Sequence, residues 1–383
     1  MFLRERLAYL GVDSVLVDAG VNEPVAVTPD VTNDRVAEAA GSTRAELIEA
    51  ERGAAVEAMA RGAASVVSDL FGEGRVDGIV ALGGSGGSTI ATAAMRALPV
   101  GTPKLMVSTL ASGDTRPYVG AVDITMMYSV VDIAGINSIS ARIIANAAAA
   151  IAGMASTKPP EIHSKPLIAA SMFGVTTPCV THAQTLLEER GYEVLVFHAT
   201  GTGGQSMERL AREGFLAGML DVTTTELADD LVGGVLSAGP ARLEAAGSEG
   251  IPQVVSLGAL DMVNFGPIET VPAEFRTRTL YQHGPAVTLM RTTPEECAEL
   301  GRRVGAKLAM ANGPTAVFVP CRGVSMIDVE GQPFHDPEAD EALRAGLRET
   351  IGGVELHELD LEINDERFAA AMANRLIELI EEK

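Results

Sequence analysis

Residues Val80–Gly120 decide the fold of this chain, and they read VALGGSGGSTIATAAMRALPVGTPKLMVSTLASGDTRPYVG. An apolar run breaks into glycines and continues as a helical pattern, and a second apolar run follows at Lys104–Thr109. A strand that enters a helix through a glycine-rich turn is typical of α/β folds. The first amides of such a helix have no intrahelical acceptor, and the helix dipole attracts negative charge there. The stretch therefore predicts a cradle for a phosphate or a carboxylate.

The spacing of these glycines identifies no single class of ligand. No lysine follows them, as a P-loop requires, and the third glycine is out of register for a dinucleotide-binding fingerprint. Glycine-rich turns also form where the chain needs only a tight strand-to-helix connection. The neighbouring hydroxyls and the segment Ser112–Asp114 favour a ligand site. The residues that we expect to contact the ligand are Gly83, Gly84, Ser85, Gly86, Gly87, Ser88, Thr89, Ser112 and Gly113.

Length and charge limit the class of protein. With 383 residues the chain is long enough for two domains that each bury a core. Its net charge is −22 and no basic run occurs, which argues against binding to nucleic acid or to an anionic membrane. The cysteines are widely spaced, so neither a disulfide framework nor a zinc site is expected. No apolar run reaches about 18 residues and no signal peptide is visible, so we expect a cytoplasmic protein.

Strand–loop–helix patterns repeat along the whole chain and predict an α/β architecture. The polar, proline-rich segment 157–166 interrupts the series, and we place a domain boundary there. The predicted domains are residues 1–164, with the glycine loop 83–89, and residues 165–383, with the glycine loop 201–204. Crossover units of this length imply parallel sheets with helices on both faces. The prediction is two Rossmann-like, doubly wound parallel-sheet domains in tandem, with a crevice between them.

Local patterns predict several individual elements. Residues Ser14–Val17 read as a strand, and Thr43–Phe71 reads as one long helix that opens with a capping box. Asn137 or Ser138 is expected to cap a helix at Ile139–Met154. That last helix is apolar nearly all round, so we expect it to lie buried between the sheet and a partner subunit.

Ligands of open α/β sheets bind at the carboxyl ends of the strands. A glycine loop in each predicted domain could clamp a phosphorylated ligand from both sides. By the strand-end rule, Arg291 and Arg322 would neutralise a phosphate or carboxylate of the substrate, although each could equally close a salt bridge. The further contacts that we expect in the second domain are Thr176, Thr177, Gly201, Thr202, Gly203 and Gly204.

Side chains near these loops are candidates for chemistry. Asp114 and Asp132 could hold Mg²⁺ beside the phosphate cradle, although an aspartate after Ser-Gly also serves as a turn residue. Cys179 lies at a predicted helix start, where the dipole lowers the pKa of a thiol and favours a nucleophile. Small buried cysteines are nevertheless common. His198 ends a predicted strand and could act as a general acid or a phosphate donor.

Five segments together resemble a known family. They are Gly83–Gly120, DITMMYSVVDIAGIN at 123–137, HATGTGGQSMERL at 198–210, GALDMVNFGP at 258–267 and GPTAVFVPCRGVSMID at 313–328. Over essentially its whole length the chain is similar to the Tm-one-like ATP-binding domain family, the bacterial and fungal relatives of the amino-terminal region of a plant tobamovirus-resistance protein. The resemblance implies two Rossmann-like domains, ATP binding, and a homodimer or higher homo-oligomer. It also implies that the first sheet lacks its first strand.

These observations predict a cytoplasmic ATP-binding protein that acts on a small metabolite, such as a sugar acid, in the crevice between the domains, using ATP and Mg²⁺. Two alternatives stay open. ATP could control the binding of a partner without turnover, as in a scaffold protein. A sugar phosphate or NAD could occupy the same crevice, because a glycine loop recognises the phosphate and not the base.

Overall fold

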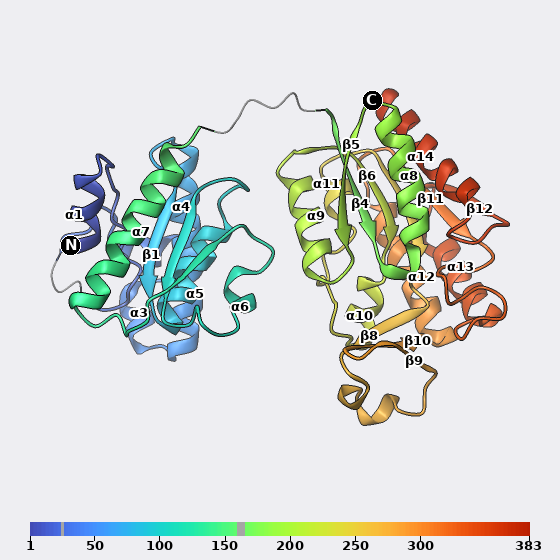
Figure 1. Ribbon diagram of the computed structural model, residues 1–383, viewed down its shortest axis with the longest axis horizontal. Coiled ribbons are helices and arrows are strands. Elements are labelled where there is room, and N and C mark those ends of the chain that lie inside the picture. The colour runs from blue at the N-terminus through green and yellow to red at the C-terminus, as the bar shows by residue number, and fades with distance from the viewer. Residues whose placement is uncertain (24–26, 159–164) are drawn as a thin grey trace. The chain divides into compact units, whose positions relative to one another are not determined.

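Two compact units divide the chain, Met1–Glu161 (unit 1) and Ile162–Lys383 (unit 2) (Figure 1). Each unit contains its own parallel sheet, so the predicted α/β class with parallel sheets is confirmed. The ranges that the computed structural model describes are residues 1–23, 27–158 and 165–383.

Unit 1 is built around three parallel strands in the order β1-β2-β3. The strands are β1 (Ile79–Gly83), β2 (Lys104–Ser108) and β3 (Thr125–Tyr128). The helices are α1 (Phe2–Tyr9), α2 (Asn33–Ala39), α3 (Arg44–Glu49), α4 (Arg52–Gly72), α5 (Ser85–Arg96), α6 (Arg116–Val119) and α7 (Ser138–Ser156). Every residue of β2 is buried, because this strand has a neighbour on each side and helices on both faces.

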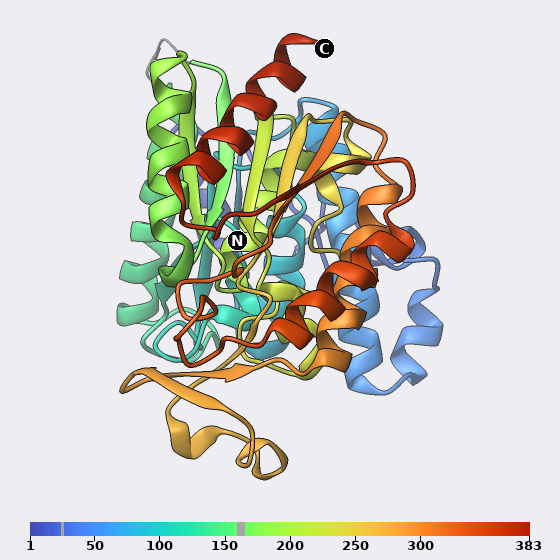
Figure 2. The same ribbon diagram turned by 90° about the vertical axis from the view of Figure 1, so that its right-hand side faces the viewer.

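Helices lie on both faces of the sheet of unit 1 (Figure 2), and the side chains of β1 and β2 alternate between these two helical layers. Ile79, Ala81 and Met106 face the layer of α4 and α5, whereas Val80 and Leu105 face the layer of α1 and α7. This alternation is what a parallel sheet covered on both faces requires. Because the three strands point the same way, the loops that follow them gather at one edge of the sheet. That edge carries the first glycine loop.

Two predicted elements of unit 1 are wrong. Residues Ser14–Val17 form only an isolated parallel bridge, because their backbone partner is the short segment around Val31. The helix predicted at Thr43–Phe71 is two helices, α3 and α4, because Ala50 is extended with a ψ of 162°. The capping box that opens α3 and the Asn137 cap of α7 are confirmed.

Helix α7 is apolar along most of its length, and unit 1 covers one side of it. Ile144, Ala147 and Ile151 are buried in the cluster formed with β2 and α1, whereas Ile139 and Ala149 are exposed. Within the described ranges, α7 is the one helix long and apolar enough to cross a membrane, and 28% of that window is buried. Its uncovered side is mixed, because Ser138, Arg142, Asn146 and Ser156 are exposed there beside Ile139, Ala149 and Gly153.

Unit 2 contains a six-stranded parallel sheet in the order β12-β11-β7-β6-β4-β5. The domain boundary predicted at 157–166 includes residues 159–164, which lie outside the described part of the chain. The strands are β4 (Leu167–Met172), β5 (Glu193–His198), β6 (Leu216–Thr223), β7 (Gln253–Gly258), β11 (Thr315–Pro320) and β12 (Glu355–Leu359). The α-helices are α8 (Thr177–Glu189), α9 (Thr202–Arg212), α10 (Glu226–Val232), α11 (Ala245–Ser248), α12 (Pro294–Ala309), α13 (Pro337–Thr350) and α14 (Glu366–Glu381). The 3-10 helices are η1 (Gly174–Thr176), η2 (Ile268–Thr270) and η3 (Ala273–Phe275).

The strand order of unit 2 reverses between β4 and β6. Strand β5 lies on one side of β4 and the later strands lie on the other, which is typical of doubly wound sheets. Helices α8 and α14 cover the face that carries Ile168 and Phe318, and α9 to α13 cover the face that carries Ala169 and Val317. The reversal makes the carboxyl ends of β4 and β6 the place where a ligand is expected in this unit.

A separate antiparallel sheet follows β7. Its order is β8-β10-β9, with β8 (Met262–Phe265), β9 (Leu280–Gly284) and β10 (Val287–Arg291). The strand-end rule that placed Arg291 assumes a parallel strand before it, but the strand that it ends is β10 of this antiparallel sheet. Arg291 therefore ends an antiparallel strand, and the rule for the carboxyl ends of parallel strands does not apply to it.

Candidate functional site

Helix α5 begins directly after β1 with unpaired backbone amides. Gly84 is its N-cap residue, and Ser88 donates the first intrahelical hydrogen bond to the Gly84 carbonyl at 2.8 Å. Among the described residues, no carbonyl or side chain accepts a hydrogen bond from the amides of Ser85, Gly86 or Gly87. The first turn also contains no acidic residue. These amides and the helix dipole together favour an anion at this point.

The glycines of this loop have room around them. A Cβ added at Gly84, Gly86 or Gly87 would meet no atom of its surroundings closer than 3.6 Å, and none of the three has a positive φ. Gly83 differs, because a Cβ there would lie 2.9 Å from the backbone of Gly87. Close packing therefore explains why a glycine is needed at Gly83, but not at the other three positions. The other three leave backbone amides accessible from outside, as the approach of a phosphate to a helix N-terminus requires.

Ser88 and Thr89 do not extend this cradle as the sequence predicts. The hydroxyl of Ser88 is fully buried and lies 2.7 Å from the hydroxyl of Ser108 at the end of β2. The hydroxyl of Thr89 donates to the carbonyl of Ser85 at 3.0 Å. Both side chains therefore serve the helix and the sheet. The prediction that Ser88 contacts the ligand is wrong, because its hydroxyl is buried in the interior.

Thr109 is a site residue that the sequence prediction missed. Its amide donates to the Gly83 carbonyl at 3.2 Å, and its hydroxyl lies 3.6 Å from the Cβ position of Gly84. A threonine directly after a strand carries no motif, so only the pairing of β1 with β2 reveals this neighbour. Ser112 and Gly113 are exposed further along the same loop.

The carboxylate of Asp114 forms an ion pair with the neighbouring Arg116. Its two carboxylate oxygens accept hydrogen bonds from the Arg116 guanidinium at 2.9 and 2.8 Å, and this contact lowers the pKa of Asp114 to about 2. The Asp132 carboxylate accepts from the amide of Ile133. The part of the chain that is described contains no group of three or more His, Cys, Asp or Glu residues that could hold a metal ion. The candidate Mg²⁺ ligand Asp114 is thus paired with Arg116 within the protein.

The second glycine loop differs from the first because a carboxylate of the protein fills it. Glu226 Oε1 accepts hydrogen bonds from the amides of Gly201 and Gly204 at 2.7 and 3.1 Å. A Cβ on Gly204 would lie 2.1 Å from this carboxylate, and one on Gly203 would lie 1.8 Å from the carbonyl of His198. The protein's own carboxylate therefore takes two of the amides predicted to bind a ligand, whereas the amides of Thr202 and Gly203 have no acceptor among the described residues.

Arg242 neutralises the carboxylate that fills the second loop. This arginine is fully buried and donates to Glu226 at 2.6 Å and to Asp221 at 2.8 Å. Glu208 accepts from Arg242 and from the amides of Leu243 and Ala245. Burial raises the pKa of Glu226 in spite of the arginine. The cluster joins β6, α9, α10 and the loop before α11 into one buried network.

The start of α8 is also closed by the protein itself. Asn364 accepts a hydrogen bond from the amide of Cys179 at 3.3 Å, and the hydroxyls of Thr176 and Thr177 both donate to the Phe173 carbonyl at 3.1 Å. Cys179 is 1% exposed, and burial raises the pKa of its thiol to about 12. The predicted nucleophile is wrong, since desolvation outweighs the helix dipole and keeps the thiol protonated.

The two arginines predicted to bind substrate are paired within the protein. Arg322 is held by Asp360 through two hydrogen bonds of 2.6 and 2.7 Å. Arg291 is buried, and it donates to Asp328 at 3.1 Å and to Asp340 at 2.7 Å. The side chain of His198, by contrast, ends β5 in an exposed position, so it keeps its predicted place at a strand end.

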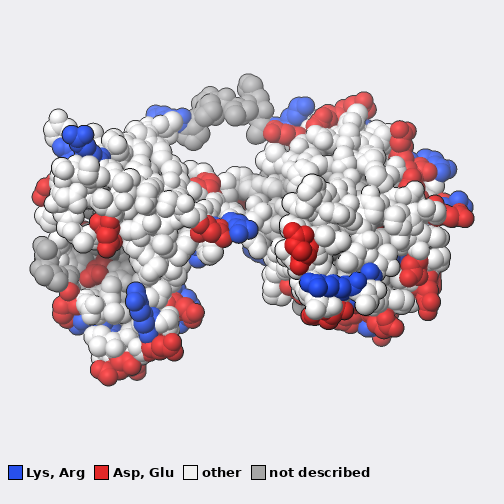
Figure 3. Space-filling view, turned by 60° about the horizontal axis from the view of Figure 1, so that its bottom comes forward, with Lys and Arg blue, Asp and Glu red and all other residues white. Residues whose placement is uncertain are grey.

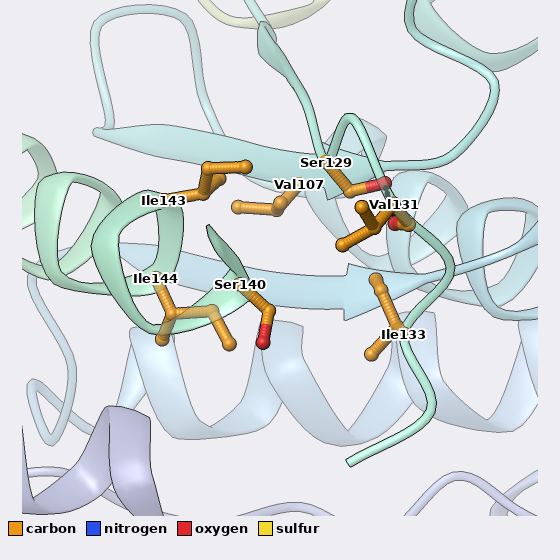
Figure 4. A pocket seen from close by; sticks show the side chains of 7 residues that line it. All are labelled: Val107, Ser129, Val131, Ile133, Ser140, Ile143 and Ile144. Carbon is orange, nitrogen blue, oxygen red and sulfur yellow. Dashed lines mark hydrogen bonds between the residues drawn. The ribbon is translucent and has the colours of Figure 1, made fainter. Parts of the chain in front are cut away.

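A small pocket lies at the carboxyl end of the sheet of unit 1 (Figure 4). Its walls come from β2, from the segment after β3 and from the first turns of α7, and the residues are Val107, Ser129, Val131, Ile133, Ser140, Ile143 and Ile144. The pocket thus opens at the same edge of the sheet as the glycine loop after β1.

Comparison with known proteins identifies the family. Residues 1–160 match the N-terminal domain, and residues 165–380 the C-terminal domain, of an uncharacterised protein family, UPF0261. The chain belongs to the UPF0261 family. This assignment confirms the resemblance drawn from the sequence, because the tomato ToMV resistance protein Tm-1 is among the relatives.

Bacterial relatives of the UPF0261 family match over nearly the full chain. A UPF0261 protein of Clostridium tetani is 54% identical over 99% of this chain and 95% of its own length, and one of Rhizobium meliloti is 49% identical over 96% and 94%. The tomato Tm-1 protein is 43% identical over 86% of this chain, but the match spans only 45% of the tomato protein. Among solved structures, a thioesterase domain from the curacin biosynthetic pathway aligns over 56% of this chain and 91% of its own, at 13% identity and a TM-score of 0.31. A likeness at that level supports no inference.

The buried cluster around Arg291 makes stability depend on pH. Burial raises the pKa of Asp328 to about 8, above its value of about 3.9 in an unfolded chain. Between these two values the folded protein holds a proton here that the unfolded chain has released, so stability falls as the pH rises from about 4 to about 8. We expect Asp328→Asn to gain stability relative to the wild type as the pH rises from 5 to 8, by up to about 1.4 kcal/mol per pH unit.

Urea denaturation at each pH measures this difference. Asp360→Asn is the control, because the exposed Asp360 has a pKa lowered by its hydrogen bonds from Arg322 and does not titrate in this range. Parallel pH profiles for the wild type and Asp328→Asn would contradict the assignment.

The two glycine loops should respond oppositely to a methyl group. Gly203→Ala places a Cβ 1.8 Å from the His198 carbonyl, so we expect a loss of about 1–3 kcal/mol or more in the free energy of unfolding. Gly86→Ala has room, and alanine is a better helix former by about 1 kcal/mol, so stability should be unchanged or higher. Chemical denaturation followed by circular dichroism distinguishes the two, and equal losses would show that both loops are closely packed.

Proposed function

We propose that this chain is a cytoplasmic ATP-binding protein whose site for the phosphates is the first turn of α5. The observation that carries the proposal is the set of amides at Ser85, Gly86 and Gly87, which have no acceptor among the described residues and lie where added atoms would meet no close neighbour. Glycines that neither packing nor a positive φ requires are expected where a ligand must approach the backbone. We further propose that the two parallel-sheet units are Rossmann-like nucleotide-binding folds.

Electrostatics support a local cradle of this kind. The chain carries a net charge of −22, and Figure 3 shows the basic side chains of the face drawn in small groups, most of them beside acidic ones. An anionic ligand must then be held by helix and backbone dipoles together with single cations. The exposed guanidinium of Arg116, oriented by Asp114, is one such cation in the loop after β2. We propose that Mg²⁺ arrives bound to the phosphates.

ATP is preferred over other phosphorylated ligands on the strength of the family resemblance. The cradle itself recognises phosphate, so NAD and sugar phosphates belong in the same ligand screen. A small metabolite such as a sugar acid would be the second ligand if ATP is a substrate.

A nucleotide-controlled binding protein is the second candidate function. Three observations support it over an enzyme. The thiol of Cys179 is buried and protonated, Arg291 lies in a buried ion cluster, and Asp114 is held by Arg116. No activated nucleophile therefore stands out among these candidates. Single-turnover experiments with labelled ATP separate the two functions, because release of ADP or transfer of the phosphoryl group requires an enzyme.

We propose that the partner of such a protein is a second copy of the chain, bound through α7. The uncovered side of this helix exposes Ile139 at 46% and the small residues Ala149 and Gly153, and the polar residues Ser138, Asn146 and Ser156 are exposed on the same helix. Arg142 is the one charged residue of α7, so two strongly acidic copies could approach here with little repulsion. Small residues also permit close packing of two helices.

Substitution in the cradle tests the site. We expect ATP at 100 times its Kd to stabilise the wild type by about 2.7 kcal/mol, and Gly86→Val to abolish this stabilisation, because the branched side chain blocks the amides. Gly53→Val on α4 is the matched control, since nothing lies within 4 Å of its Cβ position. Thermal-shift titrations with ATP, NAD and sugar phosphates provide the readout. Undiminished binding by a folded Gly86→Val protein would remove this loop from the site.

Substitution on α7 tests self-association. We expect Ala149→Glu to shift the protein to a monomer, because a buried carboxylate in each copy would be desolvated without a partner. Met310→Glu is the control, since Met310 is 81% exposed at the end of α12. Sedimentation equilibrium with and without ATP measures the oligomer. A wild-type protein that is monomeric in both conditions would contradict the proposal.

A further inference from the structure

Unit 1 exposes several large apolar side chains in one short stretch of sequence. Tyr128 ends β3 and is 42% exposed, and Val130, Ile136 and Ile139 follow it with exposed fractions of 58%, 56% and 46%. Single exposed apolar side chains are ordinary, but a group of them marks a surface that another molecule covers. We call the exposed side chains of residues 128–156 the α7 surface, because they continue along this helix.

The stretch before α7 and the helix itself form one continuous surface. Val131 and Ile133 line the same small hollow as Ile143 of α7, so this segment packs on the first turns of the helix (Figure 4). The residues that alternate with them, Val130 and Asp132, are exposed. Beyond its first residue, α7 has exposed positions every three or four residues, which is the spacing of one helix face. They are Ile139, Arg142, Asn146, Ala149, Gly153 and Ser156.

The backbone of Val130 is strained in a way that keeps its side chain in solvent. Its φ is 63°, and the amide of Val131 donates to the Ser129 carbonyl at 2.6 Å, which closes a γ-turn. A β-branched residue rarely adopts a positive φ, and γ-turns of this hand are uncommon. Little burial offsets this strain, because the side chain is mostly exposed. Backbone strain concentrates at functional positions, and a partner that covered Val130 would supply the missing contact.

The α7 surface carries one charge of each sign. Residues 124–156 contain only two charged side chains, Asp132 and Arg142, whereas charged residues make up 21% of the whole chain. Both side chains are exposed. Among the described residues, Arg142 has no hydrogen-bond or ion-pair partner, and the Asp132 carboxylate accepts only from the adjacent amide of Ile133. A carboxylate and a guanidinium therefore lie unpaired on an otherwise uncharged surface.

This charge pattern is self-complementary, which favours a second copy of the chain as the partner. In a two-fold contact the same patch of both copies meets, so a residue i that contacts j is matched by j contacting i. Two molecules with a net charge of −22 repel each other, and the α7 surface is a place where their charges balance. The same net charge disfavours an anionic membrane as the partner. Tyrosine and arginine are also enriched among the residues that dominate binding at interfaces.

We propose that a second copy covers the α7 surface in a two-fold arrangement in which Asp132 of each copy pairs with Arg142 of the partner subunit. The inference rests on the self-association proposed above and adds the residues and the symmetry that direct it. Tyr128, Val130 and Ile139 supply apolar contacts around the two ion pairs. The contact buries the exposed apolar group and offsets the strain at Val130.

Exchange of the two charges tests the pairing, with sedimentation equilibrium of the full chain as the measurement. Asp132→Arg alone and Arg142→Asp alone place like charges opposite each other, so each is expected to weaken self-association at least tenfold. The double variant restores both pairs and should associate within about threefold of the wild type. An equimolar mixture of the two single variants should form a heterodimer, because each copy then supplies the charge that the other lacks.

Matched charge changes elsewhere in unit 1 are the controls. Glu57→Arg and Arg61→Asp, both at exposed positions of α4, change the net charge by the same amounts. They lie in the helical layer on the opposite face of the sheet from α7 and should associate like the wild type.

Val130→Gly separates a role in the contact from a role in the fold. Glycine adopts a positive φ without strain, so the free energy of unfolding of the monomer should be unchanged or higher. Self-association should weaken severalfold, because the exposed apolar side chain is lost.

The outcomes distinguish this surface from self-association itself. A wild type that is monomeric at every concentration overturns both, and its binding to phosphatidylcholine vesicles would assign the surface to a membrane. A wild-type dimer that both single charge variants leave unchanged overturns this surface but leaves self-association intact. Single variants that are weakened, with no recovery in the double variant or in the mixture, overturn the pairing of Asp132 with Arg142. ATP binding at α5 is measured separately and does not depend on any of these results.

Discussion

The carboxylate of Glu226 is the contact that distinguishes the two glycine loops of this chain. It binds the amides of Gly201 and Gly204, and the buried Arg242 neutralises it. Removing one member of such a buried network would leave the charges of the others unpaired, at a cost of several kcal/mol. Glu226 therefore stays bound to the loop amides. The first turn of α5 has no corresponding carboxylate. Two loops of similar sequence therefore differ in what their amides contact, and we propose the ligand site at the first of them.

Unit 2 uses this kind of interaction repeatedly. The start of α8 is closed by Asn364, and the Arg291 cluster ties β10 to α13 and to the loop after β11. In each case the protein itself supplies the hydrogen-bond or ion-pair partner of a group at a strand or helix end, which a ligand would otherwise supply. In unit 1, by contrast, the amides of Ser85 to Gly87 have no acceptor among the described residues.

Much of the fold follows from the sequence, because parallel strands, helix caps and glycine turns are local patterns. The caps at Thr43 and Asn137 and the strand before Gly83 are examples. The break at Ala50 was missed because the apolar pattern continues across it. The site is harder to predict, since it depends on long-range approach. Glu226 lies 25 residues from Gly201 in sequence, and nothing in the motif of either loop indicates that they meet.

The same limit explains the candidate residues that were wrong. Whether Cys179 is a nucleophile depends on its burial, and whether Arg291 can bind substrate depends on Asp328 and Asp340. Both facts belong to tertiary packing. Thr109 shows the converse, because it joins the site only through the pairing of β1 with β2.

Amide chemical shifts of ¹⁵N-glycine-labelled protein, recorded during titration with ATP and Mg²⁺, test the central claim most directly. We expect the amides of Gly86 and Gly87 to shift with saturation, and those of Gly201 and Gly204 to stay in place because Glu226 already binds them. Shifts at Gly201 and Gly204 with none at Gly86 and Gly87 would contradict the assignment of the two loops.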